Sequence, residues 1–443
     1  MKRSECKKKG GVGMGGVWGL LGPEQLPISR RTRSLGLAAT IRRFNELAVP
    51  GMGGVWYGKR FLLATLGIVV AERLRQRGDK VQNIEVANAV EALACCLAFK
   101  GQGWQSDARL RGRTKLQGQT TDLSFKKVGR RGFYVSQPMR MAAVRALPAL
   151  GFAENGTTRF NAFRASEEGE AFVEDACRPY SPYNRSVVDH LVKWVRGEEN
   201  RTDTASLSEA LSPLLALSGS ACTQIRARLE LGGKNEELDS RLRRRSALNW
   251  VASLDADPAT DWGRPAEISD DRHWHDLRAG AAFFAVRDAA ISTLNAVEGA
   301  MGAEGRPTSV DDAARRTEHS IDALRRATDR FLELGHRDAE ALDFSRLCAA
   351  DSPAQVLRGL VERDGRVLRL AGSEIQAAGA AFRGTTVEES SQADEDDDGP
   401  TGDVRVPSGI SYRVRNLYLL NLDMQGRLGE WLQRNRSEAA HEQ

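Results

Sequence analysis

The sequence predicts a mainly α-helical fold with one small β-hairpin and a C-terminal region of several helices. Prolines are few, 14 in 443 residues, so helices can run without interruption. Aromatic residues make up only 6% of the chain, and the core must therefore be built largely from Leu, Val and Ala, which favours helices. Apolar residues also recur at helical spacing over most of the chain.

The N-terminal segment, residues 1–40, is rich in Gly and then in Arg, and we expect it to be disordered or poorly ordered. One hexapeptide of this segment, Gly13–Trp18, recurs letter for letter at Gly51–Trp56. A repeat this short does not indicate duplicated domains.

A helical region is expected over residues 41–197. Phe61–Gln76 is apolar on nearly every side before its charged end, which is typical of a central helix. The apolar residues of Asn83–Phe99 fall on one helical face. A polar and basic linker is expected from Gly101 to Thr121.

A domain boundary is predicted at the loop Glu198–Thr204, after an amphipathic helix over Val187–Val195 that stops at Gly197. Residues 205–385 would then form a helical assembly domain that contacts a protein partner. Its helices are expected at Leu207–Leu217, Ala221–Leu231, Glu236–Leu254, Asp276–Met301, Val310–Leu334 and Pro353–Arg363.

Local signals mark the rest of the C-terminal region. Ser309, with Asp312 three residues later, is a variant of the capping box and predicts the start of a helix. A turn at Asp364-Gly365 precedes a short expected strand, Arg366–Leu370. Residues 386–403 are acidic and are expected to form a disordered linker, and residues 404–443 are expected to dock back on the body.

Positive charge is concentrated in one stretch of the chain. Residues 100–165 hold thirteen basic residues against three acidic ones, a net charge of +10, whereas the whole chain carries +5. The remainder is therefore net acidic. Such asymmetry indicates contact with a polyanion.

A helix–hairpin–helix pattern lies inside this basic stretch. Gln137–Leu150 has the composition of a helix, with Pro148 near its end. Glu154-Asn155-Gly156 supplies a turn, and Arg159–Arg164 is the clearer strand of the expected hairpin. Ser166–Val173 restarts a helix that Ser166 is able to cap.

This order of elements resembles the C-terminal half of winged-helix domains of the bacterial regulator type. The residues that carry the resemblance are Leu150-Gly151-Phe152 and Ala165–Gly169, and it covers about residues 121–175 of the chain. Pro148 departs from the pattern, because it shortens the recognition helix of such a domain.

The resemblance implies a set of nucleic-acid-binding residues. It places Arg140 and Arg145 on the recognition helix and Arg159 and Arg164 on the wing. Long cationic side chains bind phosphates, and Arg140 or Gln137 would be placed to read a base edge. The cations that flank the module are Lys126, Lys127, Arg130 and Arg131.

The leading functional hypothesis is therefore a non-enzymatic protein that binds DNA or RNA through this basic module. The alternative is a structural subunit of a multiprotein complex that uses the winged helix to dock a protein. The Arg- and Ala-rich composition with many short helices resembles that of bacterial proteins of mobile elements or phage-defence islands, which implies a role in antiviral defence.

Two weaker patterns bear on catalysis. Gly53–Arg60 nearly matches the phosphate loop of nucleotide hydrolases, but Arg60 replaces the hydroxyl that holds magnesium. The densest group of possible metal ligands is Asp270, Asp271, His273, His275 and Asp276, without a further His or Cys at a helpful spacing. We expect neither an enzyme nor a metal or cofactor site, and a nucleotide hydrolase remains the weakest alternative.

The six cysteines are scattered without a CxxC pair, so free thiols and a reducing, cytoplasmic location are expected. The most apolar run, Phe61–Ala71, is too short to span a bilayer, and we expect no contact with a membrane.

Overall fold

The computed structural model describes residues 33–119, 121–130, 132–154, 159–254, 264–379, 381–384 and 411–441. The predicted mainly α-helical fold is confirmed, since helices dominate the described residues and the strands among them form two small antiparallel sheets. In the described part of the chain, no helix has both the length and the apolar character needed to cross a membrane.

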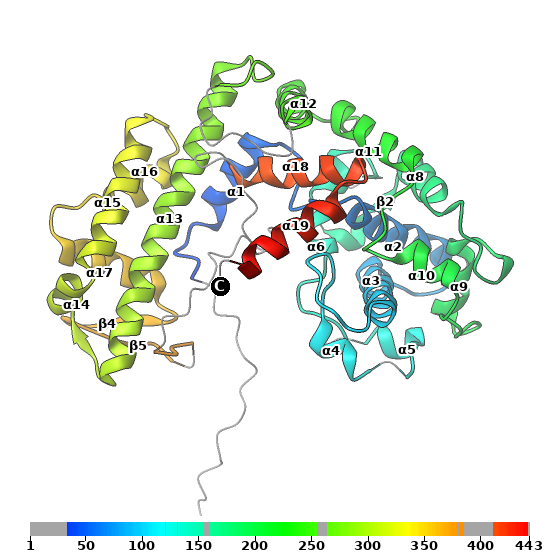
Figure 1. The fold of residues 1–443 in the computed structure, drawn as a ribbon, viewed down its shortest axis with the longest axis horizontal. Coiled ribbons are helices and arrows are strands. Elements are labelled where there is room, and N and C mark those ends of the chain that lie inside the picture. Colours follow the sequence, from blue (N-terminus) through cyan, green and yellow to red (C-terminus); the bar gives the residue numbers. More distant parts are fainter. Residues whose placement is uncertain are drawn as a thin grey trace, which may run out of the picture.

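Two lobes form an arch (Figure 1). The elements of the first lobe follow one another in the chain, beginning with α1, which also joins the two lobes. They are α1 (Ala38–Ala48), α2 (Lys59–Gln76), α3 (Asn83–Gly101), α4 (Arg113–Gln117), α5 (Phe125–Val128), α6 (Arg140–Ala143), α7 (Ala146–Ala149), β1 (Ala153–Glu154), η1 (Phe160–Ala162), β2 (Arg164–Ala165), α8 (Glu167–Cys177), η2 (Pro182–Asn184), α9 (Val187–Arg196), α10 (Ala205–Leu211), α11 (Gly219–Leu231) and α12 (Leu238–Ser253).

The second lobe follows, and the C-terminal helices then return to the first. The remaining elements are α13 (Asp271–Glu304), β3 (Thr308–Ser309), α14 (Val310–Arg316), α15 (Glu318–Glu333), α16 (Ala339–Cys348), α17 (Pro353–Asp364), β4 (Leu368–Ala371), β5 (Glu374–Ala377), α18 (Tyr412–Met424) and α19 (Leu428–His441).

The first core surrounds α2 and α3. Residues 59–71 of α2 are all buried, because neighbouring elements cover this helix on every side. Gly67 lets α3 approach closely, since a Cβ added there would lie 2.5 Å from the Cα of Ala87. The helices α8 and α9 pack against α2 as well, and α18 packs against α11 and α12.

The second core forms around α13, α15 and α17. A three-stranded antiparallel sheet in the order β3-β5-β4 closes one end of it. Phe44 of α1 stacks on Phe283 of α13 with ring centroids 5.3 Å apart, so α1 belongs to this core as well.

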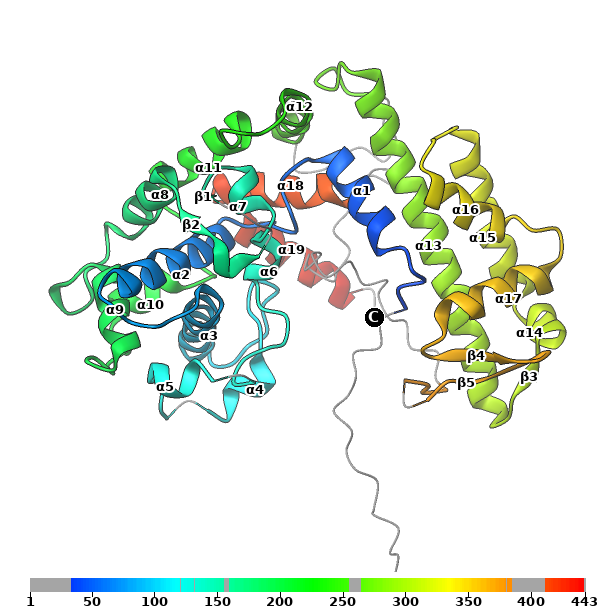
Figure 2. The same ribbon diagram turned by 180° about the vertical axis from the view of Figure 1, so that it is seen from behind.

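Two helices pass from one core into the other. In α1, Phe44 lies in the second core and Ala48 in the first. In α13, Leu277 lies in the first core and Ala279 in the second. Figure 2 shows both helices at the join between the lobes, and they therefore connect the lobes mechanically.

Most of the predicted helices are present, with different ends. The predicted helix over Leu207–Leu217 ends at Leu211, because Pro213 cannot continue it. The predicted helix over Val310–Leu334 is divided at Thr317 into α14 and α15. Ser309 accepts the backbone N–H of Asp312, which confirms the predicted cap.

Other elements differ from expectation. Residues 33–40 belong to the N-terminal segment that we expected to be poorly ordered, yet Leu35 and Leu37 are buried and α1 begins at Ala38. The helices α4 and α16 and the strand β5 were not predicted. Residues 1–32, the acidic segment 386–403 and residues 404–410 lie outside the described residues.

Candidate nucleic-acid interface

The predicted hairpin is present. β1 pairs with β2 in antiparallel fashion, with Ala153 opposite Ala165. Ser166 caps α8 as predicted, because its Oγ accepts the N–H of Gly169 at 2.9 Å. The same hydroxyl donates to the carbonyl of Gly151 at 2.6 Å, which ties the start of α8 to the start of the hairpin.

The predicted continuous helix over Gln137–Leu150 is wrong. The segment forms two short helices, α6 and α7, although Val144 and Arg145 between them keep α-helical backbone angles. Pro148 has no N–H to donate to the carbonyl of Val144, so the hydrogen-bond ladder opens there. The buried face of this segment consists of Ala142, Ala143, Ala146, Leu147 and Leu150.

The predicted strand over Arg159–Arg164 is also largely wrong. Only Arg164 lies in a strand, and Phe160–Ala162 form the 3-10 helix η1. The ring of Phe160 is buried, and the Oδ1 of Asn161 accepts the N–H of Ile84 at 2.9 Å. These contacts fasten η1 to the start of α3 and draw it out of the extended conformation.

Arg140 is held in place by groups from α3. The buried carboxylate of Glu91 accepts the backbone N–H of Met139 at 2.6 Å and that of Arg140 at 3.0 Å. The Nε of Arg140 donates to the Oδ1 of Asn88 at 2.5 Å, and its guanidinium lies 5.2 Å from the ring centroid of Phe160. Burial lowers the pKa of this guanidinium, and the nearby Glu91 opposes the shift. Arg140 is therefore preorganised rather than freely mobile.

Three of the predicted cations line one groove, here named the wing groove. It has a volume of about 530 Å³, and its lining comes from α3, α6, η1 and the segments beside them. The lining residues are Ile84, Arg140, Met141, Val144, Arg145, Arg159, Phe160 and Asn161. Arg145 is exposed and also lies 3.8 Å from Glu46 of α1.

A second hollow, here named the side groove, adjoins the wing groove at Asn161. It has a volume of about 350 Å³ and brings in the fourth predicted cation, Arg164. Its lining residues are Arg75, Val81, Gln82, Asn161, Ala162, Phe163 and Arg164. Among the described residues, five arginines and no acidic side chain line the two grooves.

The other predicted site residues lie apart from both grooves. Lys126 and Lys127 belong to α5, which packs against α3 and α9, and Arg130 donates to the carbonyl of Lys126. Gln137 is half-buried ahead of α6 and lines neither groove. Arg131 lies outside the described residues, as do Asn155 and Gly156 of the predicted turn.

Sequence reasoning missed several residues of this site. Arg75 is at the end of α2, far from the basic stretch in sequence, and reaches the side groove only through the fold. Asn161 was treated as part of a strand. Asn88 and Glu91 give no local signal, because their role is to hold the segment around Arg140 some fifty positions later.

The residues of the phosphate-loop-like pattern face the interior. The Nζ of Lys59 is buried and donates to the carbonyl of Ala210 at 2.7 Å. The N–H of Gly58, at the start of α2, donates to the buried carboxylate of Asp423 at 2.7 Å. Protein groups thus occupy the positions at which a phosphate loop meets phosphate.

The histidines of the predicted ligand group separate in space. The Nε2 of His273 donates to the carbonyl of Ala48 at 2.8 Å, whereas that of His275 donates to the carbonyl of Leu334 at 2.7 Å. Asp270 accepts the backbone N–H of Arg272 and caps α13, as one interpretation of the sequence expected.

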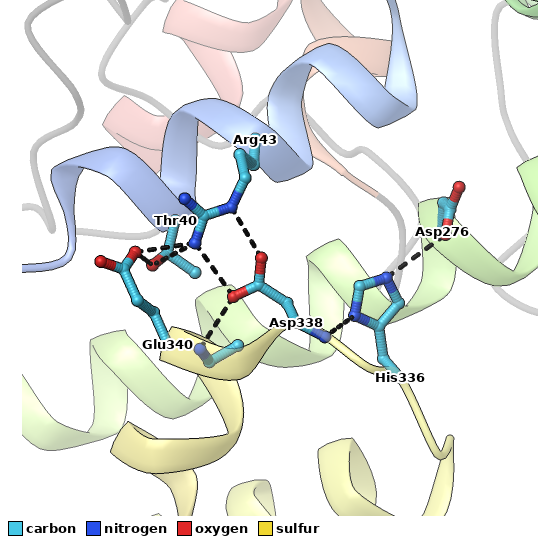
Figure 3. A network of polar contacts seen from close by, with 7 residues as sticks. Thr40, Arg43, Asp276, His336, Asp338 and Glu340 are labelled. Carbon is cyan, nitrogen blue, oxygen red and sulfur yellow. Dashed lines mark hydrogen bonds and ion pairs between the residues drawn. The ribbon is translucent and has the colours of Figure 1, made fainter.

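A cluster of titratable side chains does form there among the described residues, and its third member, His336, was not anticipated; Figure 3 shows the hydrogen bonds of His336 with Asp276 and Asp338. Ligand atoms of His275, Asp276 and His336 lie within 4.8 Å of one another. The Nδ1 of His336 accepts the N–H of Asp338 at 3.2 Å, so its Nε2 carries the proton and donates to Asp276 at 3.3 Å. The second oxygen of Asp276 accepts from Arg243 at 2.7 Å, and these hydrogen bonds give the cluster a structural role.

Comparison of the chain with protein-family models, with curated proteins and with solved structures found no match in any of the three. The interpretation of the grooves therefore depends on their own geometry and charge.

Proposed function

We propose that this protein binds nucleic acid through the wing groove and the adjoining side groove. The observation that carries the proposal is the lining of these grooves, in which the described residues include five arginines and no acidic side chain. Phosphate oxygens are the natural partners of clustered guanidinium groups, which bind them through charge and paired hydrogen bonds.

Preorganisation supports this proposal. Arg140 is already fixed by Asn88 and by the ring of Phe160, so binding a phosphate costs it little side-chain entropy. Within the described part of the chain, no group accepts a hydrogen bond from its terminal nitrogens. These nitrogens are therefore available to a ligand.

The test is a titration of fluorescently labelled oligonucleotides at several salt concentrations, read by fluorescence anisotropy. Affinity should fall with rising salt, because bound phosphates release counterions. The combined variant Arg140→Ala, Arg145→Ala and Arg159→Ala should weaken binding at low salt and reduce the salt slope by about one per lost phosphate contact.

A matched control is Arg346→Ala, which removes an exposed arginine of α16 whose partner is Asp343. This variant removes one positive charge, as each substitution of the triple variant does, and it should bind as the wild type does. Binding that is undetectable at low salt, or equal in the triple variant and the wild type, would reject the proposal.

Docking of a protein remains the second candidate. It is favoured by the outward side of α6 and α7, where the half-buried Met141, Val144, Pro148 and Ala149 are apolar. A polyglutamate competitor with the same charge as the oligonucleotide distinguishes the two candidate functions. It should displace an oligonucleotide weakly if nucleic acid is the ligand and strongly if the groove accepts an acidic protein segment.

A further inference from the structure

We infer that the grooves take a single-stranded segment of nucleic acid, with its phosphates on the arginines and its bases on the apolar side chains of the wing groove. This inference rests on the proposed function and specifies its ligand. Four features of the site support it.

The first feature is the face that α6 and α7 turn outward. A helix that reads duplex DNA lies in the major groove, about 12 Å wide, and presents polar side chains to the base edges. Each of these helices has only four residues, and the charged side chains of the segment are two arginines, the half-buried Arg140 and the exposed Arg145. This segment therefore lacks the means to read a duplex by the mode that the winged-helix resemblance implies.

The second feature is the recessed position of Arg140. Its guanidinium is largely buried and lies over Phe160 inside the wing groove. The phosphates of a duplex lie on a stiff, convex cylinder. A single strand bends at each nucleotide and can bring a phosphate down to such a group.

The third feature is the apolar surface between the arginines. Ile84, Met141 and Val144 are half-buried and line the same groove as Arg140 and Arg145. The faces of unpaired bases are apolar and gain from leaving water, whereas in a duplex they are already stacked on one another. Of these two forms of nucleic acid, the single strand is the one that gives these side chains a partner.

The fourth feature is that the wing groove continues into the side groove. Asn161 lines both grooves, and its amide is held at both ends, because Oδ1 accepts from Ile84 and Nδ2 donates to Gln82. Beyond it lie Arg75 and Arg164 of the side groove. The path thus offers phosphate-binding groups at both ends and apolar groups in the wing groove, as a strand of several nucleotides requires.

The experiment compares three labelled ligands of the same length, about 12 nucleotides, which lies in the range of single-strand binding folds. They are a thymidine oligonucleotide, a duplex, and an abasic strand that has the same phosphates without bases. Each is titrated against the full chain by anisotropy. We expect the thymidine strand to bind roughly tenfold tighter than either other ligand, since each base on an apolar platform contributes affinity.

A variant tests the base contact separately. Val144→Ser should weaken binding of the thymidine strand about fivefold and leave the abasic strand unchanged, because it removes apolar surface without altering charge. Thermal unfolding followed by circular dichroism verifies that the variant is folded. Met424→Ser, at the half-buried end of α18 away from the groove lining, is the matched control and should bind as the wild type does.

The outcomes separate the inference from the proposal beneath it. Equal or tighter binding of the duplex overturns the single-strand inference and leaves nucleic-acid binding intact. Equal binding of the abasic strand overturns the role of the bases. Failure of all three ligands to bind at low salt overturns the proposed function itself.

Discussion

A single carboxylate, that of Glu91, organises the centre of the site. It lies in the middle of α3, is 1% exposed, and accepts two consecutive backbone N–H groups where α6 begins. Burial raises its pKa, and these two hydrogen bonds oppose the shift. The position of Arg140 is therefore set by two residues of α3, Glu91 and Asn88, before any ligand arrives.

Asn88 is expected to act as a positioning residue. Asn88→Ala removes the acceptor for the Nε of Arg140 and should lower oligonucleotide affinity about fivefold, corresponding to about 1 kcal/mol for one hydrogen bond. In an Arg140→Ala background the same change should have no further effect. A double-mutant cycle by anisotropy measures this coupling, and two effects that simply add would contradict it.

Lys59 predicts a pH dependence of stability. Burial lowers its pKa to about 8, below the value of 10.5 for an exposed lysine. Between these pH values the unfolded chain binds more protons than the folded one, so the stability contribution of Lys59 rises as pH increases from about 8 to 10.5. The gain should be about 3 kcal/mol relative to a non-titrating side chain.

The comparison is between the wild type and Lys59→Met, each unfolded with urea at several pH values. The difference in unfolding free energy should increase in favour of the wild type through that window. A difference that stays constant with pH would show that the buried amine keeps its ordinary pKa.

Among the elements, those with strong internal patterns were predicted and those that depend on distant contacts were not. α2 follows from an apolar run that covers nearly every side of the helix, and α9 follows from its apolar periodicity. α1 was missed although its buried residues share one helical face, because two of them, Thr40 and Asn45, are polar. The hairpin and its cap at Ser166 could be predicted, while η1 depends on Asn161 bonding to α3.

The site, like the elements, could be predicted only where its signal lies in the local sequence. The uneven charge of residues 100–165 drew attention to Arg140, Arg145 and Arg159, and these three arginines share the wing groove. It also drew attention to Lys127, which lines neither groove. A sum of charges along the chain does not record which side of the molecule each side chain faces.

The loop before α2 is expected to control the position of α6. Gly53 has a φ of +58°, and a Cβ there would lie 2.4 Å from the carbonyl oxygen of Ala142. Gly53→Ala should therefore cost about 2 to 4 kcal/mol, combining a left-handed backbone with a backbone clash. It should also weaken oligonucleotide binding, because α6 carries Arg140.

Gly78→Ala is the control for this substitution. Gly78 also has a positive φ, +90°, but a Cβ there meets no atom within 4 Å among the described residues. It should cost only about 1 kcal/mol and leave binding unchanged. Urea unfolding and anisotropy measure both variants, and equal losses would mean that the contact with Ala142 is unimportant.

On the scale of the whole molecule, the two cores share two helices. Both α1 and α13 contribute side chains to each core, so neither lobe can unfold without disturbing a helix of the other. The loop Glu198–Thr204, suggested by the sequence as a boundary, joins α9 and α10, whose buried side chains belong to the first core. We therefore expect the lobes to unfold together.

Phe344→Ala tests this coupling. Phe344 is fully buried in the second core, and its loss should cost about 3 to 5 kcal/mol. Every tryptophan of the described residues lies in the first core or packs against it, so the fluorescence of these tryptophans reports on that core. The fluorescence midpoint in urea should shift together with the circular dichroism midpoint. A shift in circular dichroism alone would indicate that the lobes are independent.

The return of α18 to the first lobe has a consequence for biosynthesis. As the polypeptide leaves the ribosome, α2, α3 and α8 to α12 emerge early, yet Leu419 and Leu420 complete their core only after the entire second lobe has been made. Until then, the sides of α11 and α12 that α18 covers stay open to water and to other nascent chains. A chaperone that shields apolar surface during translation should therefore engage this region longest.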